Sequence, residues 1–502
     1  MMAVNNRRFF LASRNNVQRA CLILGSLLLA SGCQTNWTAV RRSESTSYNA
    51  HLQQDTRHLL DRFPDGLALT NCVEIARERN TRLAASQIAT KVAQMDRKAA
   101  FSAFLPQIQL TYDAVSLSKE PLKRFGENAI ALQDQNVRNF SAQIVQPLFA
   151  PNAWLLYRSA KRGAEMASLV QERTEQMIEL AVVGQFYQCA ALSQELERLD
   201  SELEAALQLL RETEAMAREG YVTDAELAGV RVLRMERERA RDAAQRGLRL
   251  AQSGLLHLMN LWPLADLKLK DDSLLDERNA RYAVALPGEQ PRELSAKEFA
   301  AIPVEEWMFH ALVSRKEMQI QDRSVALRRN ETLRALAMFL PNLMGFANYY
   351  TTSDSYTVNQ QYWGTGLQAT LSAFVGFRDI AAYLKARQEV KGAYVEREET
   401  AMMILVQVLE AYQNLRNAKA ALDVAEAASA AAEKTLMSMD SQYRAGFVPL
   451  SQLLQAQAAY SQAVAQKNTA AFANAAALHA FKNVVGGNIE RTDALRAEVN
   501  NP

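Results

Sequence analysis

The sequence predicts a mostly α-helical protein with a smaller β part, in which one structural unit occurs twice. Glycine (19) and proline (12) are scarce among the 502 residues, which favours long helices without breaks. Landmarks also recur at a nearly fixed distance. The triplet Phe-Leu-Pro at 104–106 returns at 339–341, 235 residues later, and Tyr187 returns as Tyr412, 225 residues later. Each triplet precedes a segment that alternates like a strand and then a long helical run, so the whole unit is duplicated.

The first 32 residues have the composition of a secretory signal rather than of a folded element. Arginines form a basic leader, and an apolar run follows. The small residues just before Cys33 are similar to the lipobox of bacterial lipoproteins, which would make Cys33 the acylated first residue of the mature chain. A plain secretory signal is the alternative. Because Gln34 follows rather than the aspartate that commonly signals inner-membrane retention, we expect the outer membrane. Residues 33–66 would form a lipidated tether.

Cysteine use and charge balance exclude several classes of protein. Cys72 and Cys189 remain once the signal is removed and Cys33 carries lipid, and no CxxC or Cys/His cluster indicates a metal site. Their spacing leaves open whether they form a disulfide. The net charge of +2 is too balanced to indicate a nucleic-acid partner. The sequence contains no phosphate-binding loop, GxSxG or HExxH motif, so it predicts neither an enzyme nor a bound cofactor.

We assign residues 67–261 to the first repeat. A helix is expected over 67–104 with Thr70 as its N-cap, and Pro106 ends it. A β-hairpin is expected over 107–149, because apolar residues there alternate with polar ones at a period of two. A long helix and a shorter returning helix, joined by a turn at Gly220, complete the repeat at 152–218 and 223–261.

Residues 304–486 repeat this order. The expected elements are a helix, a β-hairpin over 342–375, a long helix over 378–444, a turn at Gly446 and a helix over 449–486. Residues 262–303 contain four prolines and are assigned as an inserted linker, and residues 487–502 as a C-terminal tail. Helices this long cannot bury themselves in a globule, so we expect them to pack side by side as coiled coils.

The strand segments suggest a wall between lipid and water. After residue 33 no apolar run reaches 18 residues, so no membrane-spanning helix is expected. A chain that crosses a bilayer without such helices must form a closed barrel, because lipid leaves open sheet edges unsatisfied. Four strands cannot close a barrel, which needs about eight, so several copies would pool their hairpins. The alternative is a lipid-anchored periplasmic coiled-coil scaffold without a pore.

The duplicated order of helix, Phe-Leu-Pro, hairpin, long helix, glycine turn and helix resembles the TolC-like outer-membrane efflux proteins. The stretches that begin Gly-Tyr-Val-Thr at 220 and Gly-Phe-Val-Pro at 446 look like the turn signatures of that family. The resemblance spans about residues 67–486. It implies a trimer with a twelve-stranded membrane β-barrel and a helical tunnel through the periplasm. The lipidated N-terminus looks more like the branch that serves efflux pumps.

Both glycine turns are expected at the far end of the tunnel, roughly 100 Å from the hairpins. Each would expose an aromatic residue beside a glycine and a valine, a small apolar surface suited to docking a periplasmic adaptor protein. The alternative is that the aromatic residues only fasten each turn to its own helices. The predicted contact residues are Gly220, Tyr221, Val222, Thr223, Gly446, Phe447 and Val448.

The resemblance also implies a gate at the periplasmic mouth, where family members commonly carry acidic residues. The matching positions of the second copy hold Gln452 and Gln455, and Glu226 has the equivalent place in the first copy. These three residues are the gate candidates. A role as an ordinary solvated helix residue is the alternative for Glu226.

Together these features predict the outer-membrane exit duct of a tripartite efflux system. The duct would conduct substrates passively and depend on a periplasmic adaptor and an inner-membrane transporter, proton-driven or of ABC type, because no motif in the sequence binds a nucleotide. The outer-membrane duct of a type I protein secretion system is the alternative. The sequence does not separate the two cargoes, since the lumen of either duct would be wide and polar.

Overall fold

The computed structural model describes residues 37–125, 128–270, 282–284, 292–294, 302–372, 374–445, 447–448 and 450–486. The predicted signal, Cys33, Gly446 and the C-terminal tail lie outside these ranges. The chain divides into two units, residues 1–64 and 65–502. The smaller unit contains helix α2 (Trp37–Leu60), where the sequence analysis expected only a tether. Most side chains of α2 are exposed, in agreement with the polar composition that indicated a tether.

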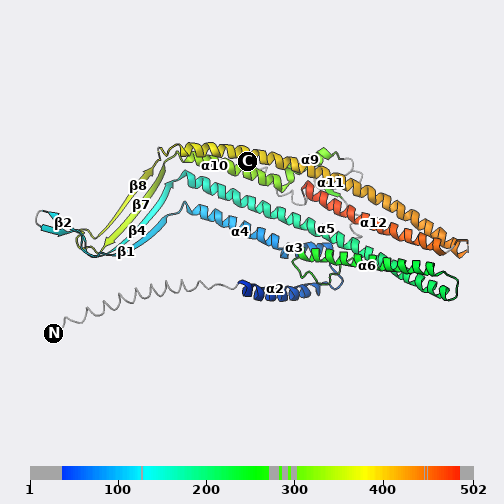
Figure 1. The fold of residues 1–502 in the computed structure, drawn as a ribbon. Helices are drawn as coiled ribbons and strands as arrows, with labels where there is room; N and C mark the ends of the chain where they lie inside the picture. Colours follow the sequence, from blue (N-terminus) through cyan, green and yellow to red (C-terminus); the bar gives the residue numbers. More distant parts are fainter. Residues whose placement is uncertain are drawn as a thin grey trace, which may run out of the picture. The chain divides into compact units, whose positions relative to one another are not determined.

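The first repeat lies in the larger unit and begins with two helices instead of one (Figure 1). The expected helix over 67–104 breaks at Asn80 into α3 (Leu69–Arg79) and α4 (Thr81–Ser102). The side-chain oxygen of Asn80 accepts hydrogen bonds from two backbone N–H groups of α4, the nearer at 2.9 Å, and so caps that helix. Its Nδ2 also donates to Leu258 O at 2.8 Å, which fixes the break against the returning helix.

The remaining helices of the first repeat start close to their predicted positions. Thr70 was wrongly expected as the first cap. The N-cap is Ala68, two residues earlier, and the Asn71 side chain accepts a hydrogen bond from Ala68 N at 3.2 Å. The long helix pair is α5 (Pro151–Arg218) and α6 (Asp224–Leu258). A proline at the first position of α5 suits a helix start, because the missing N–H would have no partner there.

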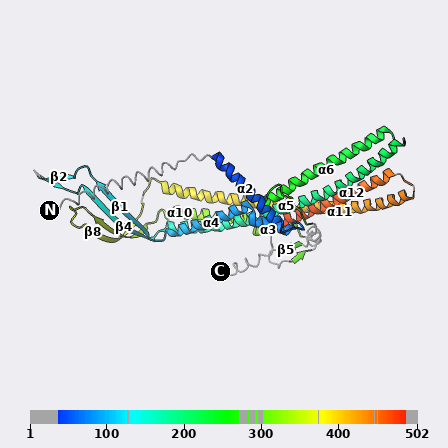
Figure 2. The ribbon, with the colours of Figure 1, turned by 90° about the horizontal axis from the view of Figure 1, so that it is seen from below.

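The second repeat has the same order and a matching break. Helices α9 (Val304–Ser314) and α10 (Lys316–Ala337) are separated at Arg315. The long pair is α11 (Arg378–Arg444) and α12 (Leu450–Val485), within one residue of the predicted bounds. In Figures 1 and 2, α5–α6 and α11–α12 form two antiparallel hairpins that extend toward the same end.

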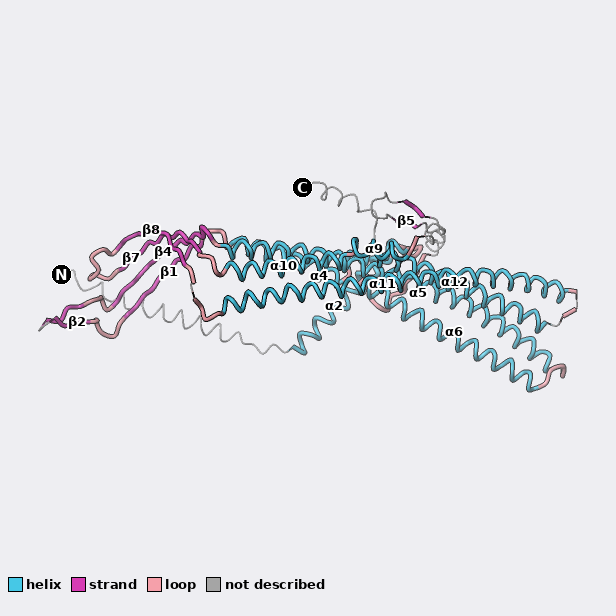
Figure 3. The backbone as a smooth tube through the Cα atoms, turned by 90° about the horizontal axis from the view of Figure 1, so that it is seen from above, coloured by secondary structure: helices cyan, strands magenta, loops and turns pink. Residues whose placement is uncertain are grey.

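Four strands form one antiparallel sheet in the order β1-β4-β7-β8, so the hairpins of the two repeats lie side by side. The pairing of β4 with β7 joins the repeats and contains an irregularity between Pro147 and Phe149. The sheet lies at one end of the long helices, and the turns of the helical hairpins lie at the other (Figure 3). The strands are β1 (Gln107–Ser116), β4 (Asn136–Phe149), β7 (Asn342–Thr352) and β8 (Gln361–Thr370).

Two small ribbons lie outside this sheet. Strand β2 (Leu122–Phe125) pairs with β3 (Asn128–Ala131) within the first hairpin. Strand β5 (Tyr282–Val284) pairs with β6 (Arg292–Leu294) within the stretch assigned as the inserted linker. Neither ribbon was predicted, because segments of three or four residues are too short to show a hydrophobic period.

One apolar cluster of the described residues lies where α9 and α10 meet α11 and α12. The rings of Trp307 and Phe481 pack edge to face, with centroids 5.4 Å apart. Full burial of such side chains contributes roughly 1.5–3 kcal/mol each. The cluster packs the C-terminal end of α12 against the middle of α11. Its members are Trp307, Ala311, Met318, Ile404, Val408, Tyr412, Leu415, Leu478, Phe481 and Val485.

Two features are absent from the described residues. No helix there is both long and apolar enough to cross a membrane. No group of three or more His, Cys, Asp or Glu side chains in the same part of the chain is placed to hold a metal ion.

Candidate functional site

The strand register gathers apolar residues on one face of the sheet. Leu110 is opposite Ala142, Ala142 is opposite Tyr349, and Tyr349 is opposite Trp363. Directly opposed residues project to the same side. Leu110 is 67% exposed and Trp363 76% exposed, so this face is not covered by the rest of the protomer. It continues through Ile108, Tyr112, Phe140, Ile144, Ala347, Leu367 and Ala369. An exposed apolar sheet face of this kind is suited to contact lipid.

The opposite face of the sheet is mostly polar. Gln109 is opposite Gln143, and the row continues through Asn348 to Gly364. Neighbouring rows add Gln107, Thr111, Ser141 and Gln368. A sheet with one apolar and one polar face can separate lipid from water.

Aromatic residues also lie on the polar face, over β7 and β8. The rings of Tyr350 and Tyr362 are 5.3 Å apart. Phe346 covers Gly366, where an added Cβ would lie 2.6 Å from the ring. Glycine is therefore required opposite Phe346, because the ring occupies the space of any larger side chain.

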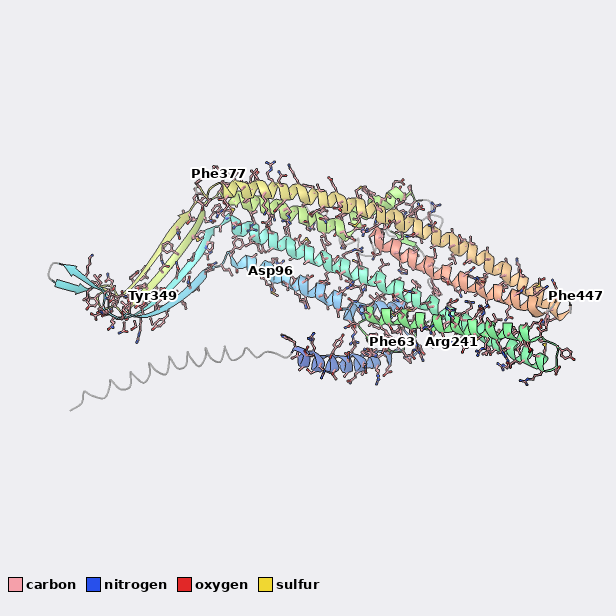
Figure 4. All side chains as sticks on the ribbon, in the orientation of Figure 1. Phe63, Asp96, Arg241, Tyr349, Phe377 and Phe447 are labelled. Atoms are coloured by element: carbon pink, nitrogen blue, oxygen red, sulfur yellow. The ribbon has the colours of Figure 1, made fainter. Side chains whose placement is uncertain are left out.

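Aromatic side chains also collect where the strands pass into the helices. In the second repeat, the rings of Phe374 and Phe377 lie 5.5 Å apart. Figure 4 shows Phe377 at this boundary. In the first repeat, four rings lie with centroids 4.9 to 6.1 Å apart, those of Phe101, Phe104, Trp154 and Tyr157. Tryptophan and tyrosine favour the boundary between lipid and water, so this collar has the composition of an interfacial belt.

The larger unit has two different flanks. Strands β1 and β8 are the two edges of the sheet, each with one neighbour. Beside the sheet the main helix contacts run in the order α4–α5–α10–α11, and toward the turns they run α6–α5–α12–α11. One flank is thus made of β1, α4 and α6, and the other of β8 and α11. Unlike flanks can associate head to tail, and such association produces a ring when the rotation closes.

The first helical turn, between α5 and α6, ends in a left-handed glycine. Gly220 has φ +79°, a conformation that strains any other residue. Tyr221 N donates to Met216 O at 2.9 Å and closes the end of α5. The Tyr221 side chain is 78% exposed, so it does not fasten the turn to its own helices. Val222 is half-buried, and Thr223 caps α6.

The second turn has the same backbone closure. Gly446 lies outside the described residues, but Phe447 N donates to Gln442 O at 2.9 Å, as Tyr221 N does to Met216 O. Phe447 is 82% exposed, and Figure 4 shows it at the end of the α11–α12 hairpin. Val448 is half-buried. The two turns therefore each present one exposed aromatic residue beside a valine.

The three gate candidates lie on the first turns of α6 and α12. The Glu226 carboxylate accepts hydrogen bonds from Thr223 N at 2.9 Å and Thr223 Oγ1 at 2.8 Å, and Glu226 N donates back to Thr223 Oγ1 at 3.2 Å. These bonds hold the pKa of Glu226 below its ordinary value. The reciprocal bonds cap α6, which gives Glu226 a local structural role. Gln452 and Gln455 are exposed on α12.

A buried polar cluster, which the sequence analysis missed, joins helices of both repeats. Arg315, whose side chain is 3% exposed, lies at the break between α9 and α10. It donates to Glu317 at 2.5 Å and to Gln407 of α11 at 2.7 Å. Arg173 of α5 contacts Glu317 at 2.7 Å and donates to Asn483 of α12 at 2.9 Å. These five residues form the Arg315 cluster.

The Arg315 cluster ties four helices, α5, α10, α11 and α12, at one level. Burial would raise the pKa of Glu317, but the hydrogen bonds and charge of Arg315, with the charge of Arg173, outweigh it and hold that pKa below its ordinary value. Sequence reasoning missed the cluster because its members are far apart, as with Arg173 and Asn483, which are 310 residues apart. An arginine at a helix break was the one local signal.

Cys72 and Cys189 are both buried free thiols. Burial raises the pKa of each thiol to about 12, and for Cys72 the nearby Cys189 adds to the shift. Thiols with so high a pKa carry little thiolate and react slowly.

Comparison with known proteins agrees with this architecture. Residues 307–487 match the family described as outer membrane efflux protein. The second repeat is thus similar to outer membrane efflux proteins. No curated protein matches the chain. The matched residues include the whole apolar cluster around Trp307 and Phe481, the strands β7 and β8, and the α11–α12 hairpin.

Solved structures of outer membrane channels have the same fold over most of this chain. The CmeC channel of Campylobacter jejuni is 16% identical with a TM-score of 0.67, and the match covers 86% of this chain and 89% of that one. VceC of Vibrio cholerae is 15% identical with a TM-score of 0.63, over 84% and 97%. The MtrE channel of Neisseria gonorrhoeae is 15% identical with a TM-score of 0.62, over 84% and 90%. The mostly helical fold with a β part, predicted from the sequence, is confirmed.

Proposed function

We propose that this protein is the outer-membrane exit duct of a tripartite efflux system. Substrates would pass through it from the periplasm to the exterior without an energy source in the duct itself. The observation that carries the proposal is the two-faced sheet at one end of the long helical hairpins. Its apolar face is suited to lipid and its polar face to a water-filled lumen.

Ring closure by three copies supports the same function. Each protomer supplies four strands, so three give the twelve-stranded barrel that the family resemblance implies. Closure pairs the free edge of β1 with the free edge of β8 on the next copy and leaves no strand edge facing lipid. Through the same rotation α11 meets α4 and α6 of the neighbour, and the helices continue the wall as a tunnel.

The exposed turns would meet the partners of the duct. Tyr221 and Phe447 extend from turns at the end remote from the sheet, and each lies beside a half-buried valine. Such a surface suits a periplasmic adaptor protein with helical hairpins of its own. The adaptor would connect the duct to an inner-membrane transporter, proton-driven or of ABC type.

Acylation of Cys33 would add a second attachment to the outer membrane. A lipid chain contributes less than twelve membrane strands, so the duct should assemble without it. Cys33→Ser should lose acyl labelling and keep most of its assembly in the outer membrane. A Cys33→Ser protein that is fully soluble in the periplasm would contradict the barrel.

Conductance tests the duct directly. Purified full-length protein in a planar bilayer should give small, stable conductances, and deletion of residues 108–145 should abolish them. A full-length trimer that never conducts, even with its turns opened by mutation, would favour the periplasmic scaffold.

Cargo distinguishes the two kinds of duct. In a strain that lacks the protein, loss of small-molecule export with normal protein secretion supports the tripartite efflux system. Loss of secretion of one protein with unchanged drug sensitivity would instead support a type I secretion duct.

A further inference from the structure

The polar face of the sheet has glycines at two successive positions of β8. Gly364 is opposite Asn348, and Gly366 is opposite Phe346. Glycine weakens a strand because it has no side chain to pack against its neighbours. Each of the two glycines therefore needs an explanation.

The fold explains Gly366 but not Gly364. A Cβ at Gly366 would collide with the Phe346 ring, whereas a Cβ at Gly364 would have no other atom within 4 Å. The φ angle of Gly364 also lies outside the left-handed region that favours glycine. Neither crowding nor backbone conformation excludes a larger residue there. A strand glycine without such a cause can mark a place where a ligand approaches the backbone closely.

Aromatic rings bound the open space over Gly364 in both directions along the strand. One row toward the loops, Tyr350 is opposite Tyr362, which is 56% exposed. One row toward the helices, the Phe346 ring covers Gly366. Successive rows of one face lie about 6.8 Å apart along an antiparallel strand. The space, called the Gly364 niche, therefore has a floor of backbone and an aromatic wall at each end.

The sides of the niche are strands. Asn348 is opposite Gly364 and exposed, so its side-chain carbonyl can accept a hydrogen bond from a ligand. On the other side, β8 is an edge of the sheet. In the closed ring of the proposed function, β1 of the next copy lies along that edge, and the niche faces the lumen.

The charge of the polar face favours cations. Within the four strands of the sheet, Asp113 is the one charged residue on this face, since Arg138 belongs to the apolar side. Asp113 is exposed and forms no ion pair in the part of the chain that the structure describes. It is opposite Asn139, one row beyond Tyr350 toward the loops. Three copies would supply three carboxylates, and a lumen with one sign of charge concentrates the opposite ion.

We propose that the Gly364 niche is a binding site for planar aromatic cations that pass through the lumen. The aromatic body lies over the backbone of Gly364, between the tyrosine pair and Phe346. Its ring stacks on the tyrosines, and its positive charge is attracted to their π faces. Asp113 attracts the cation to this end of the lumen. The proposal rests on the proposed function and names a class of cargo that the duct favours.

Block of the current by ethidium, a planar aromatic cation, tests the niche in the full-length protein in a planar bilayer. Ethidium should reduce the wild-type current in proportion to the fraction of niches that it occupies. Fluorescein, a planar aromatic anion, should leave the current unchanged. Equal block by the two dyes, or no block by ethidium, would overturn the proposal.

Two neighbouring tyrosines of β7 supply a matched pair of variants. Tyr350 borders the niche, whereas Tyr349, labelled in Figure 4, belongs to the apolar face. Tyr350→Leu should raise the half-blocking concentration of ethidium roughly tenfold, because one cation–π contact is lost. Tyr349→Leu should leave that concentration unchanged. An equal shift in the two variants would show that the dye does not bind in the niche.

Filling the niche provides a second test. Gly364→Val should abolish the block by ethidium and preserve conductance, because valine suits a strand and has open space there. Thr365→Val, at the next residue and on the apolar face, is the control and should be blocked like the wild type. Wild-type block of a conducting Gly364→Val protein would contradict a role for the glycine.

Asp113 is tested by charge alone. Asp113→Asn should raise the half-blocking concentration of ethidium, and Asp113→Glu should restore the wild-type value. Added salt should weaken the block of the wild type more than that of Asp113→Asn, because salt screens the carboxylate. An unchanged block in Asp113→Asn would remove charge from the account of the site.

Failure of the niche is distinguishable from failure of the duct. A protein that conducts, but whose block by ethidium depends on neither Tyr350 nor Gly364, overturns the niche and leaves the duct standing. A wild-type protein that never conducts contradicts the duct, and the niche with it.

Discussion

The two helical hairpins have the same shape but are held together by different chemistry. In the α5–α6 hairpin, arginines of α6 reach acidic residues of α5. Arg241 contacts Asp200 at 2.8 Å, and Arg237 contacts Glu202 at 3.1 Å. Figure 4 shows Arg241 on α6. Arg231 adds a longer contact with α5, at 3.5 Å.

The α11–α12 hairpin relies on small residues instead. Helix α12 contains no acidic residue, and alanine is its commonest residue. Ala425 and Ser429 of α11 and Ala463 of α12 are buried. Small side chains let two helices approach closely and leave little room for addition. The comparison teaches that duplicated sequences can keep an antiparallel hairpin through either ion pairs or close packing, and the two should respond differently to substitution, salt and acid.

The largest effect is expected from a substitution in the Arg315 cluster, from which both helical hairpins extend. Arg315→Met leaves Glu317 with one cation fewer in a half-buried site, and breaking a buried ion pair costs about 3–5 kcal/mol. Hydrogen exchange should quicken in both hairpins. Lys316→Met is the neighbouring control, because the Lys316–Glu172 contact is more exposed and such pairs contribute about 0–1 kcal/mol. Loosening of only one hairpin would contradict the shared anchor.

Overpacking should affect only the alanine-rich hairpin. Ala425→Leu places a larger side chain in the buried contact of α11 and should lower the free energy of unfolding by about 1–3 kcal/mol. Exchange should quicken along α11 and α12 and stay unchanged along α5 and α6. Ala428→Leu, at an exposed position one turn away, is the control and should be tolerated. Equal losses from both variants would show that the hairpin does not depend on close packing.

Loss of one carboxylate should affect the ion-paired hairpin. Glu202, which is 14% exposed, contacts both Arg198 and Arg237, and Glu202→Gln should cost roughly 1.5 kcal/mol. Added salt should weaken the exposed contacts of wild-type α5–α6 further and leave α11–α12 unaffected. Glu433→Gln, at an exposed position on α11, serves as the control. An equal salt response in both hairpins would remove the distinction between them.

Acid should have the smallest effect, at the first turn of α6. The folded-state pKa of Glu226 is lowered, mainly by its hydrogen bond to the Thr223 backbone. Its contribution is therefore present above the ordinary glutamate pKa and is lost as the pH falls through the lower folded value. Exchange at the start of α6 should quicken in acid, and Glu226→Gln should reduce this dependence. The start of α12 has no acidic residue in its first turn and should not change.

The regular parts of the fold could be predicted from the sequence. Proline-free stretches with helical periodicity placed α5 and α11 within one residue of their observed bounds, and the change of period located the four main strands. The duplicated Phe-Leu-Pro triplets indicated where both β-hairpins begin. These signals are local, so they can be interpreted without knowledge of the tertiary structure.

The irregular parts depend on contacts that are distant in sequence. The break at Asn80 is held by Leu258, 178 residues away, and the Arg315 cluster joins four helices. The exposed aromatic residues of the turns were predicted correctly as exposed, but their docking role stays a prediction. The capping bonds of Glu226 use the familiar Thr-x-x-Glu pattern, which was present in the sequence and was overlooked.

The central claim is that the polar face of the sheet lines an aqueous pore. Adjacent residues of β4 test it most directly, because Gln143 lies on the polar face and Ala142 on the apolar face. Gln143→Cys and Ala142→Cys proteins are placed in a planar bilayer and exposed to a charged, water-soluble thiol reagent. The claim predicts that the reagent reduces the current of Gln143→Cys and leaves that of Ala142→Cys unchanged. A reduction confined to Ala142→Cys, or no conductance from either protein, would contradict it.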